Sequence, residues 1–285
     1  MHMNRRTFLG LTTAAMASST ILPQLWAADA AAAAKSPIRV GTCVVGLQQA
    51  RAAGLEGVEV GVGNAADRLE IADEQVRQRY KEQMRETGLP ICSLMMGLLN
   101  SYPPASDPRA TAWLEQSIEA AHDLGAHVIL LAFFGKGDLL DGAEKVKASD
   151  VDVAVQRIKA AAPQAKDAGV ILGLENYLNG EQNARLLDRI NHASVQLYYD
   201  VFNTGTTKRH EVPADLRRLQ GRIAQFHFKN GPKYLADEPA KFEPIAAAIK
   251  EIGYRGWIVL ETSSPSKDAV ADTRRNGEYV RRLFA

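Results

Sequence analysis

Four residues spread through the second half of the chain have the types and spacing of a metal site. Glu175, Asp200, His227 and Glu261 follow one another at intervals of 25, 27 and 34 residues. Three carboxylates and one imidazole brought together would repel and desolvate one another if left alone. A divalent cation relieves that cost, and oxygen ligands with a single imidazole suit Mn²⁺, Mg²⁺, Co²⁺ or Zn²⁺. The spacing therefore predicts one divalent metal, provided that the fold brings these four positions together.

The elements that must position them alternate along the chain. Short β-rich runs are separated by longer amphipathic stretches, and helices are expected at residues 73–87, 108–124, 150–168 and 268–283. Each of the four residues closes, or nearly closes, one of the last four predicted strands. The eight strands are predicted at residues 38–43, 57–60, 89–94, 127–133, 170–174, 195–199, 223–228 and 257–260.

Eight strand–helix units in about 250 residues predict an α/β fold of the (β/α)8 TIM-barrel type over residues 35–285. Strands such as residues 128–132 (VILLA) are continuously apolar, as in a parallel sheet covered on both faces. A doubly wound open sheet is the alternative, but no G-x-G-x-x-G follows the first strand. In a barrel the carboxyl ends of the strands form the active site, so the four residues would meet there.

With these residues the chain resembles the xylose isomerase-like TIM-barrel superfamily, which includes sugar isomerases and epimerases. The resemblance spans residues 38–284 and rests on Leu174-Glu175-Asn176, Asp200, His227 within His-Phe-Lys-Asn, and Glu261. It implies that the four residues bind one divalent metal. It also implies that Glu175 and Glu261 face each other across a sugar and move its proton. A glutamate after the fifth strand contacts substrate in such epimerases, and Glu181 stands at the matching distance.

The implied chemistry is proton abstraction next to a carbonyl. The metal would polarise a ketose carbonyl and the neighbouring hydroxyl, and one carboxylate would remove the acidified proton to give an enediolate. Lys229 lies two residues after His227 on one strand, so both side chains are expected to point into the barrel. There Lys229 would bind a sugar oxygen or pair with an acid. Lys233 would reach the site from the next loop.

Two positions depart from the epimerase pattern. Asn203 stands where these epimerases usually carry a substrate-binding histidine, and it could hydrogen-bond a sugar hydroxyl. The loop after the fourth strand, Phe133-Phe134-Gly135-Lys136, has no His-Pro-Gly. The alternatives are therefore a metal-dependent lyase or hydrolase of 3-keto-glycosides, and a non-catalytic sugar-binding barrel.

The composition favours a soluble globular protein without a nucleic-acid partner. The chain is 46% apolar and 24% charged with a net charge of +1, which provides no basic field for binding nucleic acid. We expect no membrane span beyond the N-terminal segment. Cys43 and Cys92 lie in predicted strands that are too far apart to be bridged, and both are expected to be free thiols.

The N-terminus predicts export. Arg5-Arg6-Thr7-Phe8-Leu9 precedes a modestly apolar stretch and an alanine-rich segment with a cleavage zone near Ala30. The arginine pair is typical of a twin-arginine signal, with an ordinary secretory signal as the alternative. Residues 1–34 are thus read as signal peptide and linker of a periplasmic protein. Because sugar phosphates are scarce outside the cytoplasm, the substrate is expected to be a non-phosphorylated carbohydrate.

Overall fold

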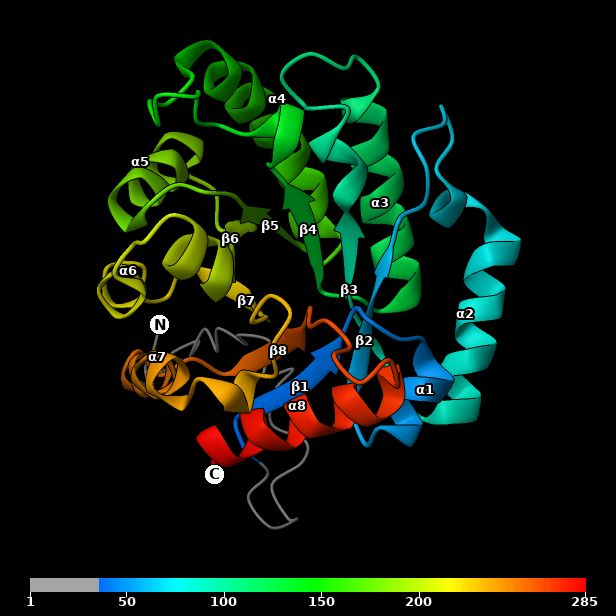
Figure 1. Cartoon of the computed structure of the whole chain (residues 1–285). Coiled ribbons are helices and arrows are strands. Elements are labelled where there is room, and N and C mark those ends of the chain that lie inside the picture. Colours follow the sequence, from blue (N-terminus) through cyan, green and yellow to red (C-terminus); the bar gives the residue numbers. More distant parts are fainter. Residues whose placement is uncertain (1–35) are drawn as a thin grey trace, which may run out of the picture. The chain divides into compact units, whose positions relative to one another are not determined.

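The computed structural model describes residues 36–285, and the predicted signal and linker, residues 1–34, lie outside the described residues. Eight parallel strands pair in sequence order, and β8 pairs with β1 to close a barrel (Figure 1). This confirms the predicted (β/α)8 fold. The strands are β1 (Ile38–Thr42), β2 (Gly57–Gly61), β3 (Ile91–Met96), β4 (Val128–Ala132), β5 (Ile171–Glu175), β6 (Val195–Asp200), β7 (Ile223–Phe228) and β8 (Gly256–Leu260).

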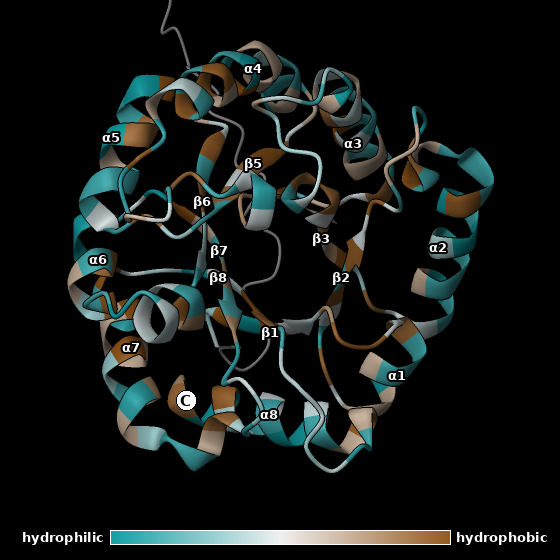
Figure 2. Cartoon of the chain, turned by 45° about the horizontal axis from the view of Figure 1, so that its top comes forward, coloured by the Kyte–Doolittle hydropathy of each residue, from teal (hydrophilic) through white to brown (hydrophobic). Residues whose placement is uncertain are grey.

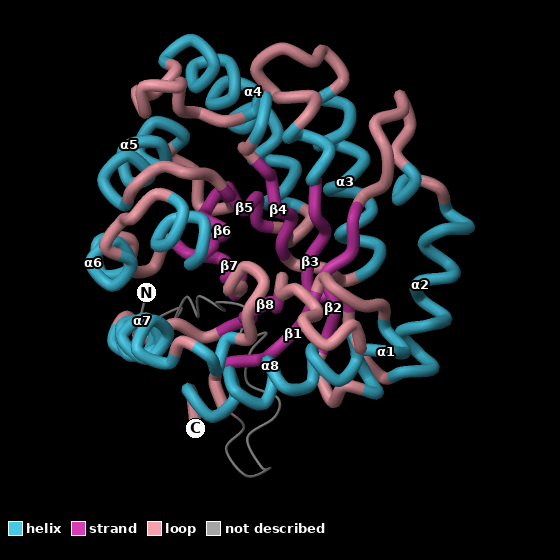
Figure 3. Tube along the Cα trace, viewed as in Figure 1, coloured by secondary structure: helices cyan, strands magenta, loops and turns pink. Residues whose placement is uncertain are grey.

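Helices surround the barrel as an outer ring (Figure 3). They are α1 (Leu47–Ala52), α2 (Glu74–Thr87), α3 (Ala110–Leu124), α4 (Ala148–Asp167), α5 (Gly180–Ile190), α6 (Val212–Arg218), α7 (Pro239–Glu251) and α8 (Ala269–Leu283). Within residues 36–285, no helix combines the length and the apolar character needed to cross a membrane.

The helix boundaries follow local chemistry. The Asp73 carboxylate accepts the backbone N–H groups of Gln75 and Val76 at the start of α2. Gly88 ends that helix at φ 70°, a left-handed conformation that glycine adopts without strain. The predicted third strand is displaced, because Pro90 has no N–H for the ladder and β3 begins only at Ile91.

Two apolar layers hold the fold together. The larger lies between strands and helices, and Figure 2 shows the apolar residues concentrated on the strands and the inner sides of the helices. The smaller lies inside the barrel and consists of Val128, Leu130, Ala132 and Tyr198. Buried polar side chains, namely Glu59, Ser93, Gln225 and His227, contact one another across the barrel interior. Cys92 is buried and Cys43 half-buried, and both are free thiols.

Candidate active site

The carboxyl ends of β5 to β8 bring the four predicted metal ligands together. Glu175 and Asp200 are the last residues of β5 and β6, His227 is the penultimate residue of β7, and Glu261 directly follows β8. One ligand atom from each residue lies within 4.8 Å of the corresponding atoms of the other three. Four side chains separated by up to 86 positions of the sequence thus meet at one point, which could hold a metal ion.

Asp200 is held by the chain that follows it. Its Oδ1 accepts the backbone N–H groups of Phe202 (2.8 Å) and Asn203 (2.7 Å), where a short π-helical segment, Asn203–Thr207, begins. Its Oδ2 is buried and accepts no hydrogen bond, although the Lys229 ammonium lies 3.0 Å away without hydrogen-bond alignment. One oxygen therefore fixes the side chain, and the other is left for a further partner.

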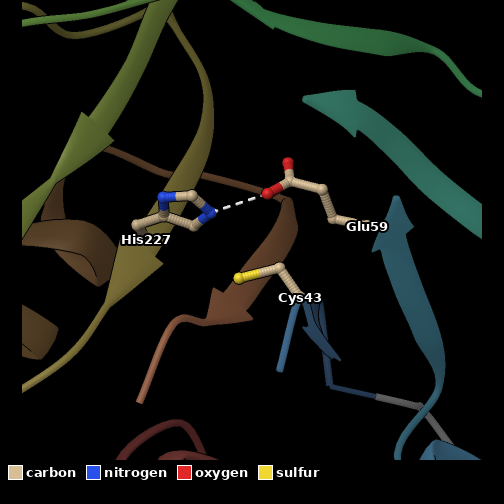
Figure 4. Close-up of side chains that lie close together, drawn as sticks. All are labelled: Cys43, Glu59 and His227. Atoms are coloured by element: carbon tan, nitrogen blue, oxygen red, sulfur yellow. Dashed lines mark hydrogen bonds and ion pairs between the residues drawn. The ribbon is translucent and has the colours of Figure 1, made fainter. Parts of the chain in front are cut away.

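His227 has a carboxylate on each side of its ring. Its Nδ1 lies 3.0 Å from Glu175 Oε1 and 3.4 Å from Glu261 Oε2. Its Nε2 lies 2.9 Å from Oε1 of Glu59, a residue of β2 on the other side of the barrel. Figure 4 shows this second contact, with the Cys43 thiol beside it. The imidazole is fully buried, so these contacts set its orientation.

Lys229 supplies the positive charge nearest to the acids. Its ammonium lies 2.6 Å from Glu261 Oε2 in addition to its contact with Asp200. The side chains of Lys229 and Glu261 are 19% and 36% exposed, whereas that of His227 is fully buried. Solvent, and any small molecule that arrives through it, thus meets Lys229 and Glu261 before the other members of the cluster.

The two glutamates have opposite acid–base character. Burial raises the pKa of Glu175 to about 7 against the opposing charge of His227. Burial acts on Glu261 in the same direction, but His227 and Lys229 outweigh it and leave the pKa of Glu261 below its usual value. Near neutral pH, Glu175 can therefore carry a proton while Glu261 is ionised.

The other buried groups respond to the same charges. Burial would lower the pKa of Lys229 and of His227, but the surrounding carboxylates raise both. Burial also raises the pKa of Asp200 and brings that of the Cys43 thiol to about 11. The cluster thus keeps its cations protonated while burial penalises its acids.

The remaining predicted substrate residues are placed differently. Asn203 is buried beside the cluster, where its backbone rather than its side chain contacts Asp200. Glu181 lies in the exposed first turn of α5 and pairs with Arg185. Lys233 is 55% exposed and pairs with Glu238 at 2.5 Å. Among the described residues, the ion pairs of Glu181 and Lys233 do not link them to the four predicted ligands.

The prediction from residues at the strand ends does not include Glu59. This residue lies in the middle of β2, and its side chain is fully buried against His227. The signal in the sequence is a charged residue within Val58-Glu59-Val60, a strand that a barrel covers on both faces. A buried carboxylate needs partners, so its position alone points to an interior polar network.

Comparison with known families agrees with this arrangement. Residues 47–283 match the family model described as xylose isomerase-like TIM barrel. The chain belongs to this family. No curated protein matches the chain.

Solved structures of sugar epimerases share the fold at low sequence identity. An L-ribulose 3-epimerase is 20% identical with a TM-score of 0.71, covering 87% of this chain and 94% of the epimerase. A D-allulose 3-epimerase from Methylomonas sp. is 16% identical with a TM-score of 0.69, covering 88% and 98%. A 3-keto-D-glucoside 4-epimerase from E. coli is 14% identical with a TM-score of 0.69, covering 87% and 100%. At these identities the similarity establishes the fold.

Proposed function

We propose that this protein is a sugar isomerase or epimerase that uses one divalent cation and acts on a non-phosphorylated carbohydrate. The observation that carries the proposal is the convergence of Glu175, Asp200, His227 and Glu261 within 4.8 Å. The names of the structurally similar epimerases support the reaction class.

The residues present fit a divalent cation. Asp200 Oδ2 is buried and accepts no aligned hydrogen bond, and its ion-pair partner is the Lys229 ammonium at 3.0 Å, so this oxygen is available as a metal ligand. Three carboxylates and an imidazole form an oxygen-rich donor set of the kind that Mn²⁺, Mg²⁺, Co²⁺ or Zn²⁺ accepts. When bound, such a cation would polarise a sugar carbonyl and the hydroxyl beside it.

The chain's own groups would then move the proton. Glu261 is ionised and the more exposed of the two glutamates, so it serves as the base that removes the proton next to the carbonyl. Glu175 can hold a proton near neutral pH and delivers it to the resulting enediolate. In the reverse direction the two roles exchange. The Lys229 ammonium binds a substrate oxygen and stabilises the negative charge that develops there.

Return of the proton decides the outcome. Delivery to the opposite face of the same carbon epimerises it, and delivery to the neighbouring carbon isomerises the sugar. The name of the structurally similar 3-keto-D-glucoside 4-epimerase is the reason for including 3-keto-glycosides in the substrate panel. On such a substrate the same base would permit elimination of a leaving group, so a lyase or hydrolase reaction is the second candidate.

Deuterium exchange tests the proposal. The protein is incubated in D₂O with a panel of ketoses and 3-keto-glycosides, with and without Mn²⁺. We expect cation-dependent deuterium incorporation next to the carbonyl of at least one substrate, with epimer or isomer as product. A released aglycone in place of an epimer would identify the lyase reaction. Binding without exchange across the panel would contradict both reactions and favour the sugar-binding barrel.

We also propose that the protein is exported by the twin-arginine route. The proposal rests on Arg5-Arg6 ahead of Phe8-Leu9. Replacing both arginines by lysine is expected to retain the precursor in the cytoplasm, which fractionation and immunoblotting would detect. Unchanged export of the double variant would instead indicate the ordinary secretory route.

A further inference from the structure

We propose that Glu59 is a positioning residue that holds the Nε2 proton of His227 and thereby presents Nδ1 to the cation. The inference deepens the proposed function and rests on it for the presence of the cation. Glu59 reaches the imidazole from β2, across the barrel from β7, and its Oε1 lies 2.9 Å from Nε2. Glu175 and Glu261, two of the three carboxylates of the proposed metal site, lie at the opposite, Nδ1 side of the ring.

The direction of the hydrogen bonds follows from the donors available. Gln225 donates from Nε2 to Ser93 Oγ at 2.8 Å. The single proton of the Ser93 hydroxyl is then directed to Glu59 Oε2, 2.7 Å away. Glu59 is therefore an acceptor at this oxygen and, as a carboxylate, also at Oε1. The group that faces Oε1 has to donate, which keeps a proton on His227 Nε2. Nδ1 is then the nitrogen that gives up its proton and offers a lone pair when a cation binds.

The surroundings prevent the ring from adopting another orientation. Glu59, Ser93, Gln225 and His227 are all buried, so no solvent replaces a lost partner. The Tyr198 ring packs against the imidazole with 4.5 Å between centroids, and the Tyr198 hydroxyl accepts a second bond from Gln225 at 3.0 Å. Rotating the imidazole would break its contact with Glu59 and move the ring against Tyr198. The network therefore specifies which nitrogen faces the acids.

A second metal site is the competing explanation of the same cluster. Ligand atoms of Cys43, Glu59 and His227 lie within 4.8 Å of one another (Figure 4). However, each Glu59 oxygen already accepts a hydrogen bond from a buried donor, and the Cys43 thiol donates to the Leu260 carbonyl at 3.6 Å. A metal there would displace these contacts, whereas a positioning role uses all of them.

Metal affinity tests the proposal independently of turnover. Metal-stripped protein is titrated with Mn²⁺ by calorimetry for wild type, Glu59→Leu, Glu59→Gln and Cys43→Ala. Loss of such a partner typically weakens metal binding by about 10- to 100-fold, so we expect this for Glu59→Leu. Glu59→Gln keeps an acceptor oxygen and is expected to lose less. Cys43→Ala, a matched control within the same buried cluster, should keep the wild-type Kd and one Mn²⁺ per chain.

Each outcome has a distinct meaning. Wild-type Kd values in both Glu59 variants would overturn the positioning role, and the Gln variant alone decides if Glu59→Leu does not fold. Two Mn²⁺ per wild-type chain, one of them lost in Cys43→Ala, would overturn it in favour of a second metal site. Failure of the proposed function has a different signature. In that case Mn²⁺ binds and depends on Glu59, yet no substrate exchanges deuterium.

Discussion

The two halves of the barrel carry different chemistry at the ends of their strands. The first half, β1 to β4, has Cys43, Gly61, Met95 and Phe134 within two residues of its strand ends, all uncharged at neutral pH. The second half, β5 to β8, presents Glu175, Asp200, His227, Lys229 and Glu261. The fold repeats the same strand–helix unit eight times, so the difference arises from the sequence rather than from the architecture.

This asymmetry agrees with what the proposed single cation would require. Its ligands have to lie within a few ångströms of one another, and four consecutive strands of a closed barrel satisfy that condition. The first half contributes Glu59, one layer deeper, where it contacts His227. We infer that one half of the barrel holds the reactive groups, while the other half orients them and offers an uncharged wall.

The largest effect is expected on removing a ligand from the charged half. Asp200→Ala or His227→Ala should abolish both the bound metal and turnover, because each leaves too few donors at one point. The barrel should remain folded, since these side chains stand at strand ends. Elemental analysis, activity and thermal melting measure the three quantities. Glu251→Gln, which removes an exposed carboxylate paired with Arg217, is the control and should retain all three.

Retention of the metal in both ligand variants would show that the charged half does not form the metal site. The contrast between the two halves would then concern electrostatics alone, with Lys229 and His227 as the cations that balance the acids.

The next effect separates proton transfer from metal binding within the same half. Glu175→Gln and Glu261→Gln each keep an oxygen ligand but remove a base, which typically costs about 10²- to 10⁴-fold in rate. An epimerase should lose turnover in both variants, because each glutamate serves one face of the substrate. A lyase should depend on one of them more than on the other. Steady-state kinetics and elemental analysis are measured together, and full activity in both metal-loaded variants would contradict the mechanism.

The ligands of the charged half could be predicted from the sequence because charged residues recur there once in each strand–helix unit. Strand ends recur once per strand–helix unit, and side chains two apart share a face, which places His227 and Lys229 together. Whether a residue after a strand faces the site or the surface is harder to predict, because it depends on where the next helix begins. Glu181 follows the fifth strand at a plausible distance, but α5 begins at Gly180 and turns it to the surface. Glu59 has no strand-end signal, and only the closed barrel brings it to His227 across 168 residues.

Lys229 offers a way to sharpen the comparison, because metal binding and catalysis should respond to it in opposite directions. Its ammonium repels a cation that shares Asp200 and Glu261. Lys229→Met should therefore bind Mn²⁺ more tightly, by roughly tenfold. It should also lower kcat by about 10²-fold, because a donor to the developing negative charge is lost. Calorimetry and steady-state kinetics on the same preparation test both changes, and weaker Mn²⁺ binding would indicate that Lys229 supports the site structurally.

The smallest effect is expected from the uncharged half. Phe134 follows β4 and is half-buried, and its ring packs edge-on against Tyr177 with 4.7 Å between centroids. Tyr177 lies two residues after Glu175 in the chain, and burial raises its pKa. Phe134→Leu keeps an apolar side chain but removes an aromatic pair worth about 0.5–1.5 kcal/mol.

If the uncharged half serves as a wall for the sugar, that loss should raise KM by about two- to tenfold and leave kcat and the Mn²⁺ affinity unchanged. Tyr80→Leu makes a comparable aromatic-to-leucine change on α2, in the outer ring of helices, and should alter neither constant. A fall in kcat with unchanged KM would contradict the inference that the uncharged half serves only to bind the sugar. Phe134 would then act on the reacting groups, through Tyr177, rather than on the binding of substrate.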